Sequence, residues 1–259
     1  MNVKNSSKNN QSTQKGRSFC IFGHTKYSLS VYLKEVVYGG TDGIITTFAV
    51  VAGFSGAAIS GDVATTLTFT VVLLFGLANL LADGVSMGLS NFLSVRTQKD
   101  QYLVTRGVVK RMIRSDTDRE FKETVELLKD KGFAEQEAVS LAEIYKNNED
   151  YWIDFLVTHK KDMSDPRGEN ATLTGLTTFT AFLVFGSVPL LPFILLDSGD
   201  AKLSFMLSIA GTFSALFLLG YLKWYILGGR FLRSVFEVVL IGGAAAVVAF
   251  WVGTFFSDL

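Results

Sequence analysis

The sequence LANLLADGVSMGLSNFLS, residues 77–94, contains a single charged residue, Asp83, in 18 positions. Stretches this apolar usually cross a lipid bilayer, where a carboxylate is costly. The polar and sulfur-bearing side chains recur at steps of three and four residues, so a helix places them in one stripe. The stretch therefore predicts a membrane helix with one polar side. The stripe consists of Asn79, Asp83, Ser86, Met87, Ser90, Asn91 and Ser94.

The composition of the 259-residue chain supports the same interpretation for the whole protein. Hydrophobic residues make up 49% of the chain, with 22 Phe and only three Pro. The formal net charge is zero, but 14 of the 24 Lys and Arg lie within residues 96–167 and six precede residue 35. This distribution is typical of a polytopic membrane protein with one polar insert, and it gives no argument for nucleic-acid binding. A single Cys excludes an intramolecular disulfide and a CxxC metal motif.

Five stretches are apolar enough to cross about 30 Å of hydrocarbon, which takes about 20 residues. Lys and Arg flank these stretches on alternating sides, which predicts a cytoplasmic N-terminus and a C-terminus on the opposite side. The expected fold is an all-α membrane protein with five transmembrane helices and a cytoplasmic helical insert between the second and third. The stretches are 36–59, 65–93, 173–196, 203–226 and 234–256.

The same pattern divides the chain into four parts. Residues 1–30 are polar and lack the apolar core of a signal peptide, so they are expected to form a disordered cytoplasmic tail. Residues 31–95 hold transmembrane helices 1 and 2, and residues 96–170 form the cytoplasmic helical domain. Residues 171–259 hold transmembrane helices 3 to 5.

The first span carries two acidic residues, Glu35 and Asp42, which are seven positions apart and so lie nearly on one helical face. Gly39 and Gly43 share that face, and glycines at this spacing let a neighbouring helix approach closely. Because hydrocarbon penalises a carboxylate, Asp42 is a functional-site hypothesis. The alternatives are a protonated or backbone-bonded Asp42 that locks helices together, and an interfacial anchor role for Glu35.

Depth in the bilayer relates the first two spans. At 1.5 Å per residue, Asp42 lies roughly 10 Å inside a boundary near Glu35, and Met87 lies roughly 12 Å inside a boundary near Val95. The two side chains can therefore meet across the glycine-lined contact, with Asp83 a turn further along. A carboxylate oxygen beside a thioether suits a transition metal such as Fe²⁺, whereas Mg²⁺ and Ca²⁺ prefer oxygen alone. The alternative for Met87 is simple packing.

In the insert, Asp116-Thr117-Asp118 is expected to cap a helix that runs to Lys131, with Gly132 as its stop. Acidic residues recur along this helix, and the default interpretation is a solvated charged face, with metal capture as the alternative. No Ser/His/Asp or nucleotide-binding pattern is found, so a soluble-type enzyme is not supported. Glu237 follows Arg233 by one turn and is expected to form a helix-end ion pair. The acidic residues are Asp116, Glu120, Glu123, Glu126 and Asp130.

Taken together, these residues resemble the vacuolar iron transporter family, which includes iron and manganese transporters of plants and fungi and many bacterial members. Four motifs carry the resemblance. It implies five transmembrane helices, a homodimer, and export of a divalent metal from the cytoplasm in exchange for protons, along a path between the first and second helices. The motifs are VVYGGTDGIITTFAVVAGFSGA (36–57), LADGVSMGLSNFLSVRTQKD (81–100), SVPLLPF (187–193) and LIGGAAAVVAFWVG (240–253).

The resemblance also assigns residues by motif position. Asp42 matches the family's first-helix aspartate, Met87 the second-helix methionine, and Glu35 the acidic position one heptad before Asp42. Asn91 stands where the family often has a glutamate. Glu120 and Glu123 correspond to a later Glu-x-x-Glu pair, a possible weak cytoplasmic metal site, but Lys160 replaces a glutamate expected in the last helix of the insert.

The leading hypothesis is a proton-coupled exporter of Fe²⁺ or Mn²⁺, in which Asp42 and Met87 bind the ion and Asp83 relays the ion or a proton. Glu35 would sit at the entrance, and Asn79 and Asn91 would line the path. The metal is the substrate, no cofactor is expected, and the partners are protons, the lipid bilayer and a second copy of the chain. The membrane would be vacuolar in a plant or fungus and the plasma membrane in a bacterium. The alternatives are a transporter of another cation or solute, and a membrane scaffold or sensor that has lost transport.

Overall fold

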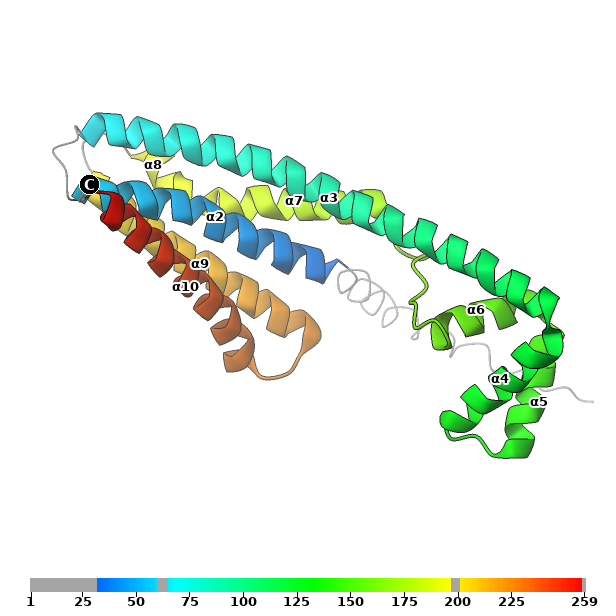
Figure 1. Ribbon diagram of the computed structural model, residues 1–259. Coiled ribbons are helices and arrows are strands. Elements are labelled where there is room, and N and C mark those ends of the chain that lie inside the picture. The colour runs from blue at the N-terminus through cyan, green and yellow to red at the C-terminus, as the bar shows by residue number, and fades with distance from the viewer. Residues whose placement is uncertain (1–31, 60–64, 197–200, 258–259) are drawn as a thin grey trace, which may run out of the picture. The chain divides into compact units, whose positions relative to one another are not determined.

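The computed structural model describes residues 32–59, 65–196 and 201–257, and within them every regular element is helical (Figure 1). The tail predicted at 1–30 lies outside these residues, as do residues 60–64 and 197–200 between the predicted spans. The elements are α2 (Leu33–Ile59), α3 (Thr65–Ser115), α4 (Thr117–Asp130), α5 (Glu135–Lys146), α6 (Glu149–His159), α7 (Ala171–Gly186), the 3-10 turn η1 (Val188–Leu190), α8 (Leu191–Leu195), α9 (Ala201–Leu227) and α10 (Phe231–Ser257).

Within the described residues, five helical segments are long and apolar enough to cross a membrane. This confirms the prediction of an all-α chain with five candidate spans. The second segment is the longest, because α3 continues without a break from the apolar stretch at 77–94 into the polar sequence that follows. The segments are Leu33–Ser55, Phe69–Ser115, Ala171–Leu195, Leu203–Leu227 and Phe231–Phe255.

The third span differs from the continuous helix predicted at 173–196. α7 ends at Gly186 and is followed by η1 and the five-residue α8. Pro189 and Pro192 have no backbone N–H with which to continue the helical hydrogen bonds, so the helix breaks here. The buried Ser208 hydroxyl of α9 donates to the Pro189 carbonyl oxygen at 2.7 Å. The break is therefore partly stabilised by a side chain of the neighbouring span.

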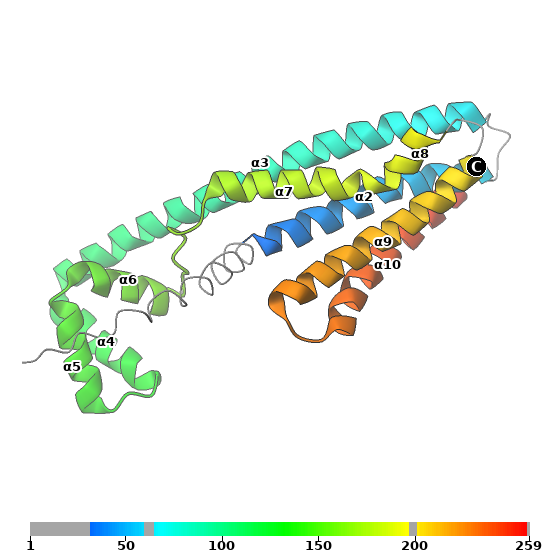
Figure 2. The ribbon, with the colours of Figure 1, turned by 180° about the vertical axis from the view of Figure 1, so that it is seen from behind.

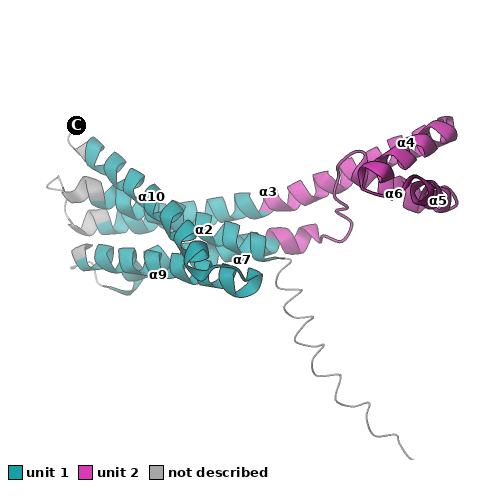
Figure 3. Ribbon diagram, turned by 90° about the horizontal axis from the view of Figure 1, so that it is seen from below, with its two compact units in different colours: residues 1–88, 176–259 teal, residues 89–175 magenta. Residues whose placement is uncertain are grey.

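The chain forms two compact units (Figure 3). Unit 1 comprises residues 1–88 and 176–259, and unit 2 comprises residues 89–175. In unit 1, α2, α9 and α10 run side by side (Figures 1 and 2). Two apolar clusters hold unit 1 together, and α2 contributes to both. One joins α2 to α3, α7 and α8 around Val51 and Phe182, and the other joins α2 to α9 and α10 around Ile44 and Leu216.

Glycines bring α2 close to a neighbouring helix, as the sequence predicted, but the neighbour is α7. A Cβ atom at Gly39 would lie 2.7 Å from the Thr178 carbonyl oxygen, and one at Gly43 would lie 2.5 Å from the Phe182 carbonyl oxygen. The expectation that these glycines line a contact between Asp42 and the second span was therefore wrong. The glycines fix the α2–α7 distance.

Unit 2 is built from the second part of α3 together with α4, α5 and α6. Trp152 and Leu156 of α6 pack against Tyr102 and Val109 of α3, and all four side chains are almost fully buried. A smaller apolar cluster joins α4 to α5. Burial of these apolar surfaces provides most of the stabilisation that is available to a small helical unit.

The boundaries of α4 agree with the sequence prediction. The Asp116 carboxylate accepts a hydrogen bond from the backbone N–H of Arg119 at 3.0 Å, which caps the helix. The helix ends at Asp130, and Gly132 follows with φ +98°, a conformation that glycine adopts without strain.

Asp154 of α6 links three polar side chains of unit 2. Its carboxylate accepts hydrogen bonds from the Tyr102 hydroxyl at 3.1 Å, from Arg106 Nε at 2.8 Å and from Arg167 Nη2 at 2.7 Å. Burial by itself would raise the pKa of Asp154, but the three donors outweigh it and hold the pKa below its usual range. The carboxylate is therefore ionised in the folded unit at neutral pH.

Candidate functional site

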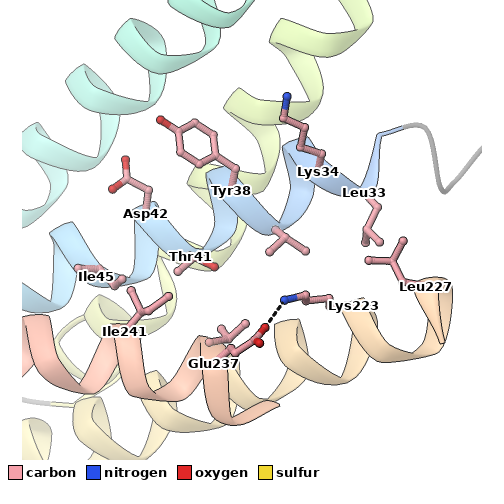
Figure 4. Close-up of a pocket in the computed structure, with 12 residues that line it drawn as sticks. Leu33, Lys34, Tyr38, Thr41, Asp42, Ile45, Lys223, Leu227, Glu237 and Ile241 are labelled. Carbon is pink, nitrogen blue, oxygen red and sulfur yellow. Dashed lines mark hydrogen bonds and ion pairs between the residues drawn. The ribbon is translucent and has the colours of Figure 1, made fainter. Parts of the chain in front are cut away.

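Asp42 lies in the third turn of α2 and borders a pocket of 720 Å³ between α2, α9 and α10. In Figure 4 the side chains of Lys34, Tyr38 and Asp42 project from one side of α2, as their spacing of four residues requires. Thr41 points instead toward α9 and α10 (Figure 4). The rest of the wall is mostly apolar, with aliphatic side chains such as Ile45.

An ion pair forms part of the pocket wall. Lys223 Nζ of α9 lies 2.8 Å from Glu237 Oε2 of α10, and Arg233 Nε lies 2.9 Å from Glu237 Oε1 (Figure 4 draws the first pair). The ion pair expected between Arg233 and Glu237 is confirmed, and Lys223 adds a second cation. Glu237 is therefore neutralised, whereas Asp42 forms no ion pair with any Lys or Arg of the described chain.

Asp42 of α2 and Asp83 of α3 belong to the same compact unit. Both side chains are partly buried, and both lie within candidate spans. Like charges in a medium of low polarity repel strongly unless a proton or a cation lies between them. The structure therefore places two carboxylates of unit 1 within candidate spans, where hydrocarbon penalises an uncompensated charge.

The other residues of the predicted stripe occupy different surroundings. Asn79, one turn before Asp83, borders a separate pocket of 360 Å³ between α2, α3 and α10. Met87, one turn after Asp83, packs against the apolar cluster around Phe182. This contact gives Met87 a packing role, and its role as a metal ligand stays a prediction. Asn91 is half-buried and belongs to unit 2.

Three polar atoms on α2 are buried without a hydrogen-bond partner among residues 32–59, 65–196 and 201–257. They are Oε2 of Glu35, near the start of the helix, the hydroxyl oxygen of Thr41, which borders the 720 Å³ pocket, and the hydroxyl oxygen of Thr47. Buried polar atoms normally have a partner, so these atoms mark places where water or an ion can bind.

Sequence reasoning missed Thr41 and also missed Tyr38, although the four-residue spacing of Tyr38 from Asp42 was a usable signal.

In unit 2 the structure brings Glu120 and Glu123 together, but with a lysine. Lys160 Nζ lies 2.7 Å from Glu120 Oε2 and also contacts Glu123 Oε2. The side chain of Glu120 is only 3% exposed, so the interpretation of this helix face as fully solvated was wrong at that residue. Hydrogen bonds from Lys160 and Arg119 hold the pKa of Glu123 below its usual range.

No three His, Cys, Asp or Glu side chains of the described chain lie close enough together to hold a metal ion. Inside the candidate spans, such acidic side chains therefore lie singly or in pairs. Any ion bound at Asp42 would need further ligands of another kind, such as a thioether, a carbonyl, a hydroxyl or water.

The fold and the site define an all-helical membrane protein that places carboxylates inside its candidate spans. Residues 33–254 match the VIT family, and the chain belongs to this family. The chain is 29% identical over 230 residues to "Vacuolar iron transporter 1" of Arabidopsis thaliana, a match that covers 88% of each protein. It is 32% identical over 238 residues to "Vacuolar iron transporter" of Toxoplasma gondii, covering 89% of this chain and 76% of the relative. A relative from Plasmodium falciparum, "Vacuolar iron transporter", is 28% identical over 228 residues, covering 85% and 81%. The family resemblance inferred from the motifs is confirmed, and membership indicates metal transport.

Proposed function

We propose that this protein exports a divalent transition metal, Fe²⁺ or Mn²⁺, from the cytoplasm across its membrane in exchange for protons. The observation that supports the proposal most strongly is the presence of two carboxylates, Asp42 and Asp83, inside candidate spans of the same compact unit. Two carboxylates at this position attract a divalent cation when both are ionised. A proton that binds either of them weakens that attraction. One pair of residues can therefore couple metal release to proton uptake.

Each remaining residue of the path has a role that fits its surroundings. Glu35, with a buried oxygen that has no partner in the described chain, would receive the ion at the start of α2. Met87 would supply a thioether next to the carboxylates, which favours Fe²⁺ over Mg²⁺ or Ca²⁺. Asn79 and Asn91 would supply neutral oxygen atoms along α3.

We propose a homodimer with the N-terminus and residues 96–170 in the cytoplasm and the C-terminus on the opposite side. A second copy would add another Asp42 and Met87 to a path in which one chain offers few ligands. Exposed polar residues in the apolar part of α3, such as Ser86, support this arrangement because lipid would leave them without partners. The named relatives are vacuolar, and a vacuolar membrane is the proposed location; the alternative is a bacterial plasma membrane.

The test is a flux assay on the purified chain in proteoliposomes, with a panel of Fe²⁺, Mn²⁺, Co²⁺ and Zn²⁺ and a pH-sensitive dye inside the vesicles. The proposal expects Fe²⁺ or Mn²⁺ to move and to drive a proton current in the opposite direction. Metal movement without a proton current would contradict the proposed exchange with protons. If none of the four ions moved, metal transport itself would be contradicted.

One observation favours a second candidate function, transport of another cation or of an organic solute on the same scaffold. The pocket beside Asp42 has a volume of 720 Å³ and mostly aliphatic walls, which is large for a bare metal ion. Competition between the metal panel and cationic organic solutes in the same vesicles distinguishes the two. If neither metals nor solutes move, the third hypothesis, a membrane scaffold or sensor, is favoured.

A further inference from the structure

A lysine joins two helices of unit 2 through two carboxylates. Lys160 follows the last residue of α6, and its ammonium lies 2.7 Å from Oε2 of Glu120 and contacts Oε2 of Glu123, both in α4. The second oxygen of Glu123, Oε1, accepts a hydrogen bond from Arg119 Nε at 2.9 Å. Three of the four carboxylate oxygens are therefore already bound by cations of the chain itself.

Lys160 is the cation that faces the buried carboxylate of Glu120. The Glu120 side chain is 3% exposed and that of Lys160 is 23% exposed. A buried carboxylate that loses its counter-ion is strongly destabilising, because water does not replace the missing partner. Burial by itself would lower the pKa of Lys160, but the two carboxylates outweigh it and raise the pKa, so the ammonium stays charged.

The surroundings hold the pair in place. Thr124, one turn after Glu120, donates to the Glu120 carbonyl oxygen at 2.7 Å, and its hydroxyl accepts a hydrogen bond from Trp152 Nε1 at 2.8 Å. All three side chains are buried. The Thr124–Trp152 hydrogen bond thus joins α4 to α6 one turn from the ion pair. This contact opposes a movement of α4 away from α6 that would expose the two carboxylates to another ligand.

An ammonium and a divalent metal ion compete for the same oxygen atoms. Lys160 supplies a compact positive charge with three N–H donors, and two of its contacts are carboxylate oxygens. A metal ion that approached these oxygens would have to displace the ammonium and would meet the positive charge of Arg119 as well. The geometry leaves the metal ion no unoccupied pair of carboxylate oxygens.

We propose that the Lys160 ammonium is the built-in cation of the Glu120–Glu123 pair, so that unit 2 holds α4 against α6 without a bound divalent ion. A divalent ion binds there only when Lys160 is removed. This goes beyond the proposed function, because it concerns residues outside the membrane path and does not depend on transport. It also argues against the weak metal site that the sequence suggested at the same two glutamates.

The test is hydrogen exchange, measured by mass spectrometry on peptides from residues 117–160 of the full purified chain, with and without Mn²⁺. Wild type, Lys160→Gln and Lys161→Gln are compared; Lys161 is the adjacent, exposed lysine. In Lys160→Gln, exchange without metal is expected to be at least about tenfold faster than in wild type, and Mn²⁺ is expected to restore slow exchange. Wild type and Lys161→Gln are expected to show no response to Mn²⁺.

A double variant, Glu120→Gln with Lys160→Gln, keeps the test decisive if the single variant does not fold. Because this variant removes both charges, its residues 117–160 are expected to exchange more slowly than those of Lys160→Gln. Their exchange rate is expected to be the same with and without Mn²⁺. Protection of wild-type residues 117–160 by Mn²⁺, or unchanged exchange in metal-free Lys160→Gln, would overturn the proposal. Any Mn²⁺ that binds near Asp42 binds outside the measured peptides. The exchange result at residues 117–160 can therefore be interpreted even if the transport proposal fails.

Discussion

Gly43 of α2 lies directly against the main chain of Phe182 in α7, so close that a Cβ atom would come 2.5 Å from the Phe182 carbonyl oxygen. This contact fixes the rotation of α2 about its own axis. Asp42, the preceding residue, thereby lies on the side of α2 from which Lys34 and Tyr38 also project (Figure 4). The position of the acidic group thus depends on a backbone contact with a third helix.

Gly43→Ala is therefore expected to destabilise the protein by about 1–3 kcal/mol, because the added methyl group forces α2 and α7 apart. Thermal unfolding in detergent measures the loss. Gly243→Ala in α10 is the matched control, since the nearest atom to its added Cβ is a ring carbon of Phe213 at 3.9 Å. Equal melting temperatures for the two variants would contradict the importance of the α2–α7 contact.

Met87→Leu separates metal binding from packing at this position. Leucine fills a similar volume, so the melting temperature is expected to stay within a few degrees of wild type. Loss of the thioether is expected to raise the Fe²⁺ concentration for half-maximal flux about tenfold, which corresponds to about 1.4 kcal/mol of binding free energy. If flux is unchanged, Met87 acts only through its contact with the apolar cluster around Phe182.

Thr124→Val in α4 removes the acceptor for the buried Trp152 indole N–H, which lies 2.8 Å from the Thr124 hydroxyl oxygen. The variant leaves a buried donor without a partner and is expected to lose about 1–3 kcal/mol of unit 2 stability. Tryptophan fluorescence during unfolding, measured in a background in which Trp224 and Trp251 are replaced by Phe, reports the loss. Thr124→Ser keeps the hydroxyl and is expected to behave much more like wild type.

Unit 2 is expected to lose stability in acid through Asp154. Its pKa is lowered in the folded unit, because hydrogen bonds from Arg106, Arg167 and Tyr102 outweigh burial. A lowered folded-state pKa contributes stability above the unfolded-state value, near about 4, and this contribution disappears as pH falls through the folded-state pKa. Hydrogen exchange in α6 should therefore accelerate below about pH 4. Asp154→Asn should flatten this pH dependence, whereas Asp118→Asn, at a side chain 91% exposed, should not.

Much of the fold follows from local sequence. Length and hydropathy predict the five candidate spans, since crossing a bilayer needs about 20 apolar residues. Asp116 and Gly132 mark the limits of α4, because an N-cap acceptor and a glycine at positive φ are local signals. The Glu237–Arg233 pair is also local, since four residues separate its members on one helix.

The features that sequence did not predict depend on contacts between distant segments. Glu120 resembles its solvated neighbours along α4, and only the approach of α6 shows that it is buried beside Lys160. The break after Gly186 was signalled by Pro189 and Pro192, but apolar composition alone favoured one continuous span. Which helix lies against Gly43 cannot be read from a glycine spacing, because the same spacing suits any partner helix.

Asp42 is the residue proposed to bind the transported metal ion, and metal-driven proton flux in proteoliposomes with Asp42→Asn tests this role most directly. Asparagine has nearly the same size but no negative charge, so flux is expected to fall to the background of protein-free vesicles while the melting temperature and oligomeric state stay those of wild type. Asp100→Asn, at an exposed residue of α3, is the control and is expected to keep wild-type flux. Flux through Asp42→Asn equal to that of wild type would contradict the role assigned to Asp42.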